Sequence, residues 1–292
     1  MEVTKPIPEQ LHRYFSFDRG MEMLGSKKLY FANLSSYNDI FESVPATDFV
    51  EAATVTPERA AQVLKEMQET KEGKYLISLI EESFPSSEIV LSTALASMMT
   101  SSVGMPILGL ALAGIYALYK GAKKSERKQI EYYIANYGPI ITTVRTCCFT
   151  SNPDNILMWA HYAEWNTGMV VSFNTDVKYW IGEHFKPVIY KDNRLPLPDK
   201  SENTHEYLWK LLTTKAKCWA YEDEWRMLKF NMGGENTLTI NPSAISAIRL
   251  GIRANQKNRD EALALRDKLY PQIPVLIEKR SCDKFALVFD EL

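Results

Sequence analysis

The amino-acid sequence predicts an α+β fold in which a mixed, largely antiparallel sheet is interrupted by a helical insertion. Short segments with strand-like patterns occur near the N-terminus and again after residue 140. Between them, residues 51–139 show the apolar spacing of helices. A chain of 292 residues, 46% of them hydrophobic, is long enough for a sizeable core. We therefore expect a core domain formed by residues 1–50 and 140–292, with 51–139 inserted as helices.

Overall charge and cysteine usage argue against two classes of protein. A net charge of -2 does not fit a highly basic nucleic-acid scaffold. The four cysteines form no CxxC pair, and the adjacent Cys147 and Cys148 are poorly placed for a structural disulfide. The first fifteen residues lack an apolar core behind a basic start, so we expect no cleaved signal peptide. These features predict a cytoplasmic protein.

The elements are predicted from apolar periodicity, turn residues and helix-capping residues. A short helix capped by Asp18 follows the first strand, and a helix opened by Thr56 and Pro57 ends near Gly73. The expected strands are 10–17, 28–31, 140–151, 169–173, 188–190, 222–230, 237–240, 247–250, 275–277 and 285–289. The other expected helices are 129–137, 154–165, 202–213 and 255–270.

Residues 89–119 form an uncharged run that is long enough to span a bilayer, which needs about 20 apolar residues. Serine and threonine dilute the run, and Gly104 and Pro106 interrupt it. This composition favours two short helices that form a buried hairpin. Membrane contact stays open as an alternative, because small residues suit close helix packing in lipid and a basic cluster follows the run.

The stretch 215–226, KAKCWAYEDEWR, places three carboxylates, three aromatic side chains and three cations in twelve positions. In a strand, Glu222, Glu224 and Arg226 would share one side, so that two carboxylates and a guanidinium would form a reactive site. In a helix, Glu222 and Arg226 would form an ordinary pair four residues apart. The position of the stretch after a helix and before later strands favours a strand edge.

Several segments together resemble the bacterial domain-of-unknown-function family 2971. The segments are LHRYFSF, LYFANLSSYNDIFE, CFTSNPDNILMWAHYAEWNTGMVVSF and LLTTKAKCWAYEDEWRM. Within them, the ordered motifs are Asn38-Asp39-x-x-Glu42, Met158-Trp159-x-x-Tyr162, and Lys215 through Glu224-Trp225-Arg226. The family name implies no activity, but such genes look like accessory or defence-type genes, so the resemblance implies an effector, toxin or antiphage role.

A second resemblance concerns mono-ADP-ribosyltransferases of the Arg-Ser-Glu type. Arg13, the Phe149-Thr150-Ser151 element and Glu222-Asp223-Glu224 occur in the order of that family's motifs, although Thr150-Ser151 lacks the full Ser-Thr-Ser. The resemblance implies NAD as a substrate, cleaved at the nicotinamide–ribose bond, and a protein or nucleic acid as acceptor. Cleavage develops positive charge on the ribose, which a neighbouring carboxylate stabilises.

The same resemblance implies a role for each matched residue. Glu224 would stabilise the ribose charge, Glu222 would orient or deprotonate the acceptor, and Ser151 would fix a local hydrogen bond. Arg13 would pair with a phosphate through its planar guanidinium. Tyr14, Trp159 or Tyr162 would stack on the nicotinamide or adenine, whereas the three-residue spacing of Trp159 and Tyr162 on a helix also suits core packing.

Other interpretations use the same residues differently. In a metal-dependent nuclease or phosphoesterase, Asp39, Glu42, Glu222 and Glu224 would bind magnesium while Lys215 or Arg226 neutralises a phosphate. Asn38, Asp39 and Glu42 also suit purely local capping and turns, and His161 is either a general base or a structural residue. The histidines show no zinc-site spacing, so we expect no such metal site. A non-enzymatic interaction or defence protein would act through residues 51–139.

Overall fold

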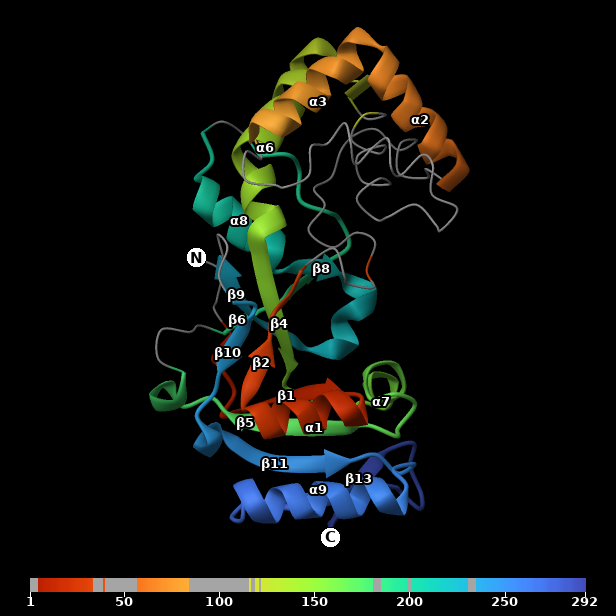
Figure 1. Cartoon of the computed structure of the whole chain (residues 1–292), viewed down its shortest axis with the longest axis vertical. Helices are drawn as coiled ribbons and strands as arrows, with labels where there is room; N and C mark the ends of the chain where they lie inside the picture. Colours follow the sequence, from red (N-terminus) through yellow and green to blue (C-terminus); the bar gives the residue numbers. More distant parts are fainter. Residues whose placement is uncertain are drawn as a thin grey trace. The chain divides into compact units, whose positions relative to one another are not determined.

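The structure is a computed structural model of the chain, and it describes residues 5–33, 39, 57–83, 116, 119–120, 122–180, 185–198, 201–230 and 235–292 (Figure 1). The chain folds into two compact units. The first, which we call the sheet unit, comprises Met1–Ala32, Arg145–Lys191 and Lys215–Leu292. The second, the helical unit, comprises Asn33–Val144 and Asp192–Thr214.

The main sheet of the sheet unit has the strand order β13-β12-β11-β5-β1-β4-β9-β6, and β3 (Ala32–Asn33) also pairs with β4. Strand β11 runs parallel to β12, while β5 pairs antiparallel with both β1 and β11. The prediction of an α+β fold with a mixed, largely antiparallel sheet is therefore confirmed. The strands are β1 (Gln10–Phe15), β4 (Val144–Thr150), β5 (Met169–Asn174), β6 (Lys186–Pro187), β9 (Glu224–Phe230), β11 (Ile245–Leu250), β12 (Val275–Arg280) and β13 (Leu287–Glu291).

Side-chain alternation divides this sheet into two faces of different character. One face, the core face, carries the large apolar cluster that includes Leu11, Phe149, Val171, Trp225 and Ile248. Helices α1 (Phe17–Ser26) and α9 (Gln256–Leu269) pack on it. The other face, the polar face, bears the intervening residues of the same strands, which are His12, Tyr14, Thr146, Cys148, Thr150, Ser172, Glu224, Arg226, Arg249 and Glu278. The candidate site lies on the polar face.

Two short helices illustrate how sequence fixes packing in the sheet unit. Helix α1 begins after Ser16, and Asp18 lies in its first turn instead of capping it as predicted. At Gly20 a Cβ atom would contact the end of the Met169 side chain, so a larger residue there would require this methionine to move. On the polar face, α7 (Ile156–Tyr162) is capped by Asn155 and packs Trp159 against Tyr14.

Two smaller sheets complete the strand pairing. Strand β2 (Lys28–Tyr30) pairs antiparallel with β10 (Thr237–Thr239), and β7 (Ile189–Lys191) pairs with β8 (Thr214–Ala216). Short 3-10 helices occur at Val177–Tyr179, Lys217–Glu222 and Pro242–Ala244. The second of these immediately precedes β9 and positions part of the candidate site.

The helical unit contains α2 (Pro57–Glu69), α3 (Lys71–Ser83), α6 (Lys124–Thr143) and α8 (Thr204–Leu212). Helix α3 packs on α2 and α6, and its apolar cluster includes Leu64, Leu76, Ile80 and Ile134. Where α6 meets α8, the Tyr137 and Tyr207 rings pack edge to face with centroids 5.1 Å apart. The helix that the sequence predicts to open at Thr56 and Pro57 is present as α2, and α3 continues the helical structure to Ser83.

Several predicted boundaries are wrong for identifiable reasons. The chain leaves α2 at Glu69 and begins α3 at Lys71, so a single helix does not continue to Gly73. Residues 140–143 belong to α6 and not to a strand, so the β propensity of isoleucine and threonine does not decide the structure there. Helix α7 ends at Tyr162, before three left-handed residues, Glu164, Trp165 and Asn166, turn the chain towards β5.

The predicted hairpin at residues 89–119 lies outside the described residues except for Tyr116 and Tyr119. In the part of the chain that the structure describes, every helix is too short or too polar to cross a bilayer. Membrane contact through residues 89–119 stays a prediction.

Candidate functional site

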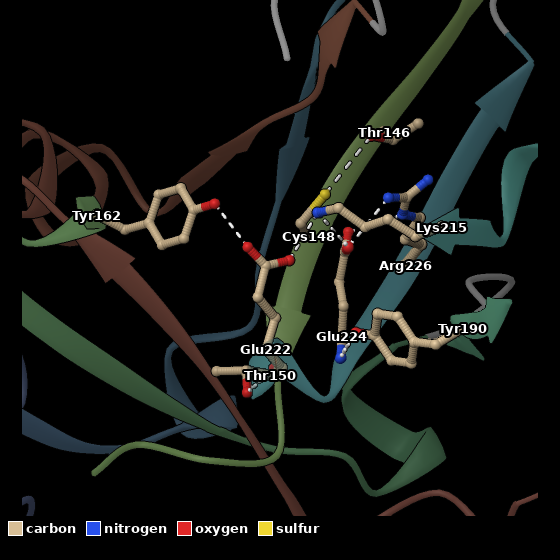
Figure 2. A network of polar contacts seen from close by, with 9 residues as sticks. All are labelled: Thr146, Cys148, Thr150, Tyr162, Tyr190, Lys215, Glu222, Glu224 and Arg226. Atoms are coloured by element: carbon tan, nitrogen blue, oxygen red, sulfur yellow. Dashed lines mark hydrogen bonds and ion pairs between the residues drawn. The ribbon is translucent and has the colours of Figure 1, made fainter. Parts of the chain in front are cut away.

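Four charged side chains of the sheet unit meet on the polar face, and we call them the charged cluster: Lys215, Glu222, Glu224 and Arg226 (Figure 2). Lys215 comes from β8, while Glu224 and Arg226 point to the same side of β9. Glu222 is the last residue of the 3-10 helix Lys217–Glu222, and Asp223 then adopts a left-handed conformation with φ 41°. The predicted strand 222–230 therefore begins two residues later, at Glu224, yet Glu222 still reaches the cluster.

The two carboxylates share one ammonium group. Lys215 Nζ lies 2.6 Å from Glu222 Oε2 and 3.2 Å from Glu224 Oε2. Arg226 donates from Nε to Glu224 Oε1 at 2.7 Å and from Nη2 to Glu224 Oε2 at 3.0 Å, which is a bidentate pair. Tyr162 Oη donates to Glu222 Oε1 at 2.6 Å from the opposite side (Figure 2). All four charged residues are at most 8% exposed.

The charged cluster combines two basic with two acidic side chains, and electrostatics hold Glu224 and Lys215 in their charged forms. Burial alone would raise the pKa of Glu224, but the Arg226 guanidinium and the Lys215 ammonium outweigh it and lower that pKa to about 2. Burial alone would lower the pKa of Lys215, whereas Glu224 and Glu222 raise it above its ordinary value. Glu224 therefore stays anionic at any physiological pH.

Neighbouring polar groups hold the backbone and side chains of the cluster. Thr150 Oγ1 donates to the Glu222 carbonyl at 2.6 Å, and the Glu224 amide donates to Tyr190 Oη at 2.8 Å. The Cys148 thiol forms a further hydrogen bond with Glu224 and lies 3.8 Å from Thr146 Oγ1. Sequence reasoning missed Thr150, Cys148 and Tyr190 as site residues. Alternation along β4 would have placed Cys148 and Thr150 on one face, whereas no local signal points to Tyr190.

In the metal-binding alternative, the position of the metal ion is already occupied by a lysine side chain. The Lys215 ammonium lies between Glu222 and Glu224, where a metal ion would have to bind both. Among the described residues, no group of three or more histidine, cysteine or acidic side chains is arranged to hold a metal ion. Asp39 is buried and belongs to the helical unit, while Asn38 and Glu42 lie outside the described residues. The magnesium site stays a prediction.

Arg13 and Ser151, which are predicted to bind NAD, do not join the cluster. Arg13 lies on the core face of β1, where Nη1 donates to the Tyr30 carbonyl at 3.3 Å and to Cys147 Sγ. The sheet thus separates Arg13 from Glu224. Ser151 lies next to the cluster along the chain, but its hydroxyl donates to Asp223.

The aromatic candidates have three different environments. Tyr14 and Trp159 pack together in the apolar cluster beneath α7, where Tyr14 Oη donates to the Asn152 carbonyl at 3.0 Å and Trp159 is fully buried. His161 is exposed near the end of α7, 6.2 Å from Tyr162 between ring centroids. Of the predicted cofactor-binding residues, only Tyr162 contacts a carboxylate of the cluster.

Comparison of the chain with family models, curated proteins and solved structures gives no match. The resemblance to domain-of-unknown-function family 2971 and the resemblance to ADP-ribosyltransferases therefore stay predictions, and the geometry of the charged cluster carries the functional argument.

Proposed function

We propose that the charged cluster is the catalytic centre of an enzyme that cleaves the nicotinamide–ribose bond of NAD and transfers the ADP-ribosyl group to a macromolecule. The observation that carries the proposal is the convergence of two buried carboxylates, Glu222 and Glu224, on one ammonium group. A role as a bacterial effector or defence protein belongs to the same proposal and rests on the sequence resemblance.

The cost of burying this cluster supports a role beyond stability. Four ionisable side chains have been removed from water, and the attraction within such groups often only offsets their desolvation. Well-packed apolar residues of similar volume frequently stabilise a protein as much as a buried ion pair does. Titratable groups with strongly shifted pKa values are common at functional sites, because catalysis needs pKa values that are matched to the reaction. The charged cluster is therefore the best candidate for chemistry in the described sheet unit.

The residue types suit a reaction that passes through a positively charged ribose. When the bond to nicotinamide breaks, its electron pair leaves with nicotinamide and positive charge develops on the ribose carbon. Glu224, held anionic by Arg226 and Lys215, would stabilise that charge in the transition state. The acceptor would attack the ribose carbon as nicotinamide departs, and Glu222 would take the acceptor's proton in the same step.

Tyr162 and Lys215 would tune Glu222 in this scheme. Both donate hydrogen bonds to its carboxylate, one to each oxygen, so its orientation is fixed. Arg13 lies on the core face and has no part in the scheme, so the phosphate partner implied by the resemblance is not carried over.

The proposal is tested by incubating the purified full-length protein with NAD labelled in its adenylate part, together with a cell lysate. We expect nicotinamide release and transfer of the label to macromolecules, and we expect Glu222→Gln and Glu224→Gln to abolish both. Glu278→Gln is the matched control, because Glu278 is another buried acid of the polar face, hydrogen-bonded by Asn166 and the Ile252 amide. Absence of NAD binding, nicotinamide release and labelled product with folded wild-type protein would overturn the proposal.

A further inference from the structure

Helix α7 is linked at both of its ends to the segment that carries Glu222. Its last residue, Tyr162, donates a hydrogen bond to Glu222 Oε1 at 2.6 Å (Figure 2). Its N-cap residue, Asn155, donates from Nδ2 to the Tyr221 carbonyl at 2.9 Å. The two ends of α7 thus hold two neighbouring residues, one by its carboxylate and one by its backbone.

Both polar atoms of the Asn155 side chain take part. Oδ1 accepts from the backbone amides of Leu157 at 2.9 Å and Met158 at 3.1 Å, which caps the first turn of α7. Nδ2 meanwhile donates to the Tyr221 carbonyl. Serine, another preferred N-cap residue, would supply the capping oxygen but has no second polar atom to place at that carbonyl. The amide of asparagine therefore does two things that a cap alone does not require.

Three successive carbonyl groups, those of residues 221–223, accept hydrogen bonds from the chain between the end of β4 and the start of α7. Their donors are, in order, Asn155 Nδ2, Thr150 Oγ1 at 2.6 Å and the Ser151 amide at 3.3 Å. Thr150 is 1% exposed and Glu222 is 3% exposed, so little water competes for the middle contact. The backbone from which Glu222 projects is thus fixed on consecutive residues.

Of these three donors, only Asn155 is the cap of a helix that itself reaches the carboxylate. Apolar packing of Trp159 against Tyr14 holds α7 on the sheet. Such packing is non-directional, whereas a hydrogen bond fixes a distance and an angle. Because α7 is only seven residues long, a shift of its first turn would carry Tyr162 with it. The contact of Asn155 therefore sets where the Tyr162 hydroxyl lies relative to residues 221 and 222.

We propose that Asn155 is a positioning residue that acts on Glu222 through Tyr162. It fixes α7 against the 3-10 helix Lys217–Glu222, so that the Tyr162 hydroxyl meets Glu222 Oε1 and orients the carboxylate. A general base works only within hydrogen-bond reach of the proton that it takes, so its orientation affects the rate. The effect on catalysis rests on the proposed function, whereas the coupling of Asn155 to Tyr162 does not.

The test compares nicotinamide release from NAD by full-length wild type, Asn155→Ser, Tyr162→Phe and the double variant, per mole of folded protein. We expect Asn155→Ser to lower the maximal rate about ten-fold or more and to leave KM for NAD unchanged, since Asn155 acts on the base and not on NAD. The matched control is Asn255→Ser. Asn255 caps α9 by accepting from the Asn258 amide, and its side chain makes no other hydrogen bond among the described residues. This control should keep the wild-type rate.

The double variant separates positioning from a general structural role. If Asn155 acts through Tyr162, Asn155→Ser should cost less than about two-fold in rate once the Tyr162 hydroxyl has been removed. Equal fold-losses in the wild-type and Tyr162→Phe backgrounds would overturn the proposal. An unchanged rate in Asn155→Ser, or an equal loss in Asn255→Ser, would overturn it as well.

The unfolding equilibrium decides the coupling even if wild type releases no nicotinamide. That result would refute the proposed function alone. Urea denaturation of the same four proteins should then show that Asn155→Ser raises the unfolding equilibrium constant about three-fold more in wild type than in Tyr162→Phe. Additive effects on unfolding would overturn the proposal. Asn155→Asp, which keeps the capping oxygen and lacks the amide donor, replaces Asn155→Ser if that variant does not fold.

Discussion

Glu222 and Glu224 reach the same ammonium group, Lys215 Nζ, although one residue ends a 3-10 helix and the other begins a strand. The left-handed Asp223 between them turns the chain so that both carboxylates lie on the polar face. Two like charges are thereby held close together by a single cation. Stability and reactivity of the sheet unit both depend on this arrangement.

Replacing Lys215, the cation that both carboxylates share, should reveal how much it contributes to stability. We expect Lys215→Met to lower the free energy of unfolding by about 3–5 kcal/mol, because two buried carboxylates then lose the ammonium group that they share. Urea denaturation measures the change. The control Lys210→Met removes an exposed ion pair with Glu202 and Glu206 and should cost at most about 1 kcal/mol. Equal effects of the two variants would contradict the account.

Acid should weaken the protein through Glu224. Its folded pKa of about 2 lies below the ordinary value of 4.5, so the unfolded chain takes up this proton first as the pH falls. The stabilising contribution of Glu224 is thus complete above about pH 4.5 and is lost as the pH falls towards 2. We expect the difference in unfolding free energy between wild type and Glu224→Gln to shrink over this range. A difference that stays constant from pH 7 to pH 3 would contradict the pairing.

The Tyr162 hydroxyl should matter for stability because it donates to a buried carboxylate. We expect Tyr162→Phe to cost about 1.5–3 kcal/mol, the range for hydrogen bonds to charged groups. Tyr30→Phe, at an exposed residue, should change stability by less than about 0.5 kcal/mol. Thermal or urea unfolding of both variants measures the comparison, and an undiminished stability of Tyr162→Phe would show that Glu222 does not need this donor.

His12 should make the folded protein less stable in mild acid. Burial and then Arg249 lower its folded pKa from 6.5 to about 3, so only the unfolded chain becomes protonated as the pH falls below 6.5. Stability should therefore fall by up to about 1.4 kcal/mol per pH unit from this residue alone. His12→Asn should remove that part of the slope. In wild type, the NMR signals of the His12 ring should not shift between pH 7.5 and pH 5, and a shift there would refute the burial argument.

The sequence was sufficient to predict the fold class and part of the charged cluster. Strand alternation correctly placed Glu224 and Arg226 on one side, and the density of charge in residues 215–226 identified the cluster. It did not reveal that Glu222 ends a 3-10 helix. Neither the left-handed conformation of Asp223 nor the hydrogen bond from Thr150 to the Glu222 carbonyl can be read from the local pattern. Long-range contacts of this kind leave no local pattern.

The position of Arg13 shows that the order of motifs along a chain is not enough to predict a site. Arg13, Ser151 and Glu224 follow one another as the resemblance requires, yet order along the chain does not determine which face of a sheet a residue occupies. Arg13 has the same parity as Leu11 and Phe15, both of which belong to the core cluster. That parity was readable in the sequence and indicates the core face. Tyr190 had no comparable signal, since its contact with the Glu224 amide joins distant segments.

The most direct test of the central claim is the rate of nicotinamide release from NAD by Glu222→Gln relative to wild type, per mole of folded protein. The account predicts release by wild type, a loss of about 100-fold or more in Glu222→Gln because a general base is removed, and an essentially unchanged rate in Glu278→Gln. Urea unfolding of each variant establishes that the protein is folded. A wild-type protein that releases no nicotinamide, or a Glu222→Gln variant that is as active as wild type, would contradict the claim that the charged cluster is catalytic.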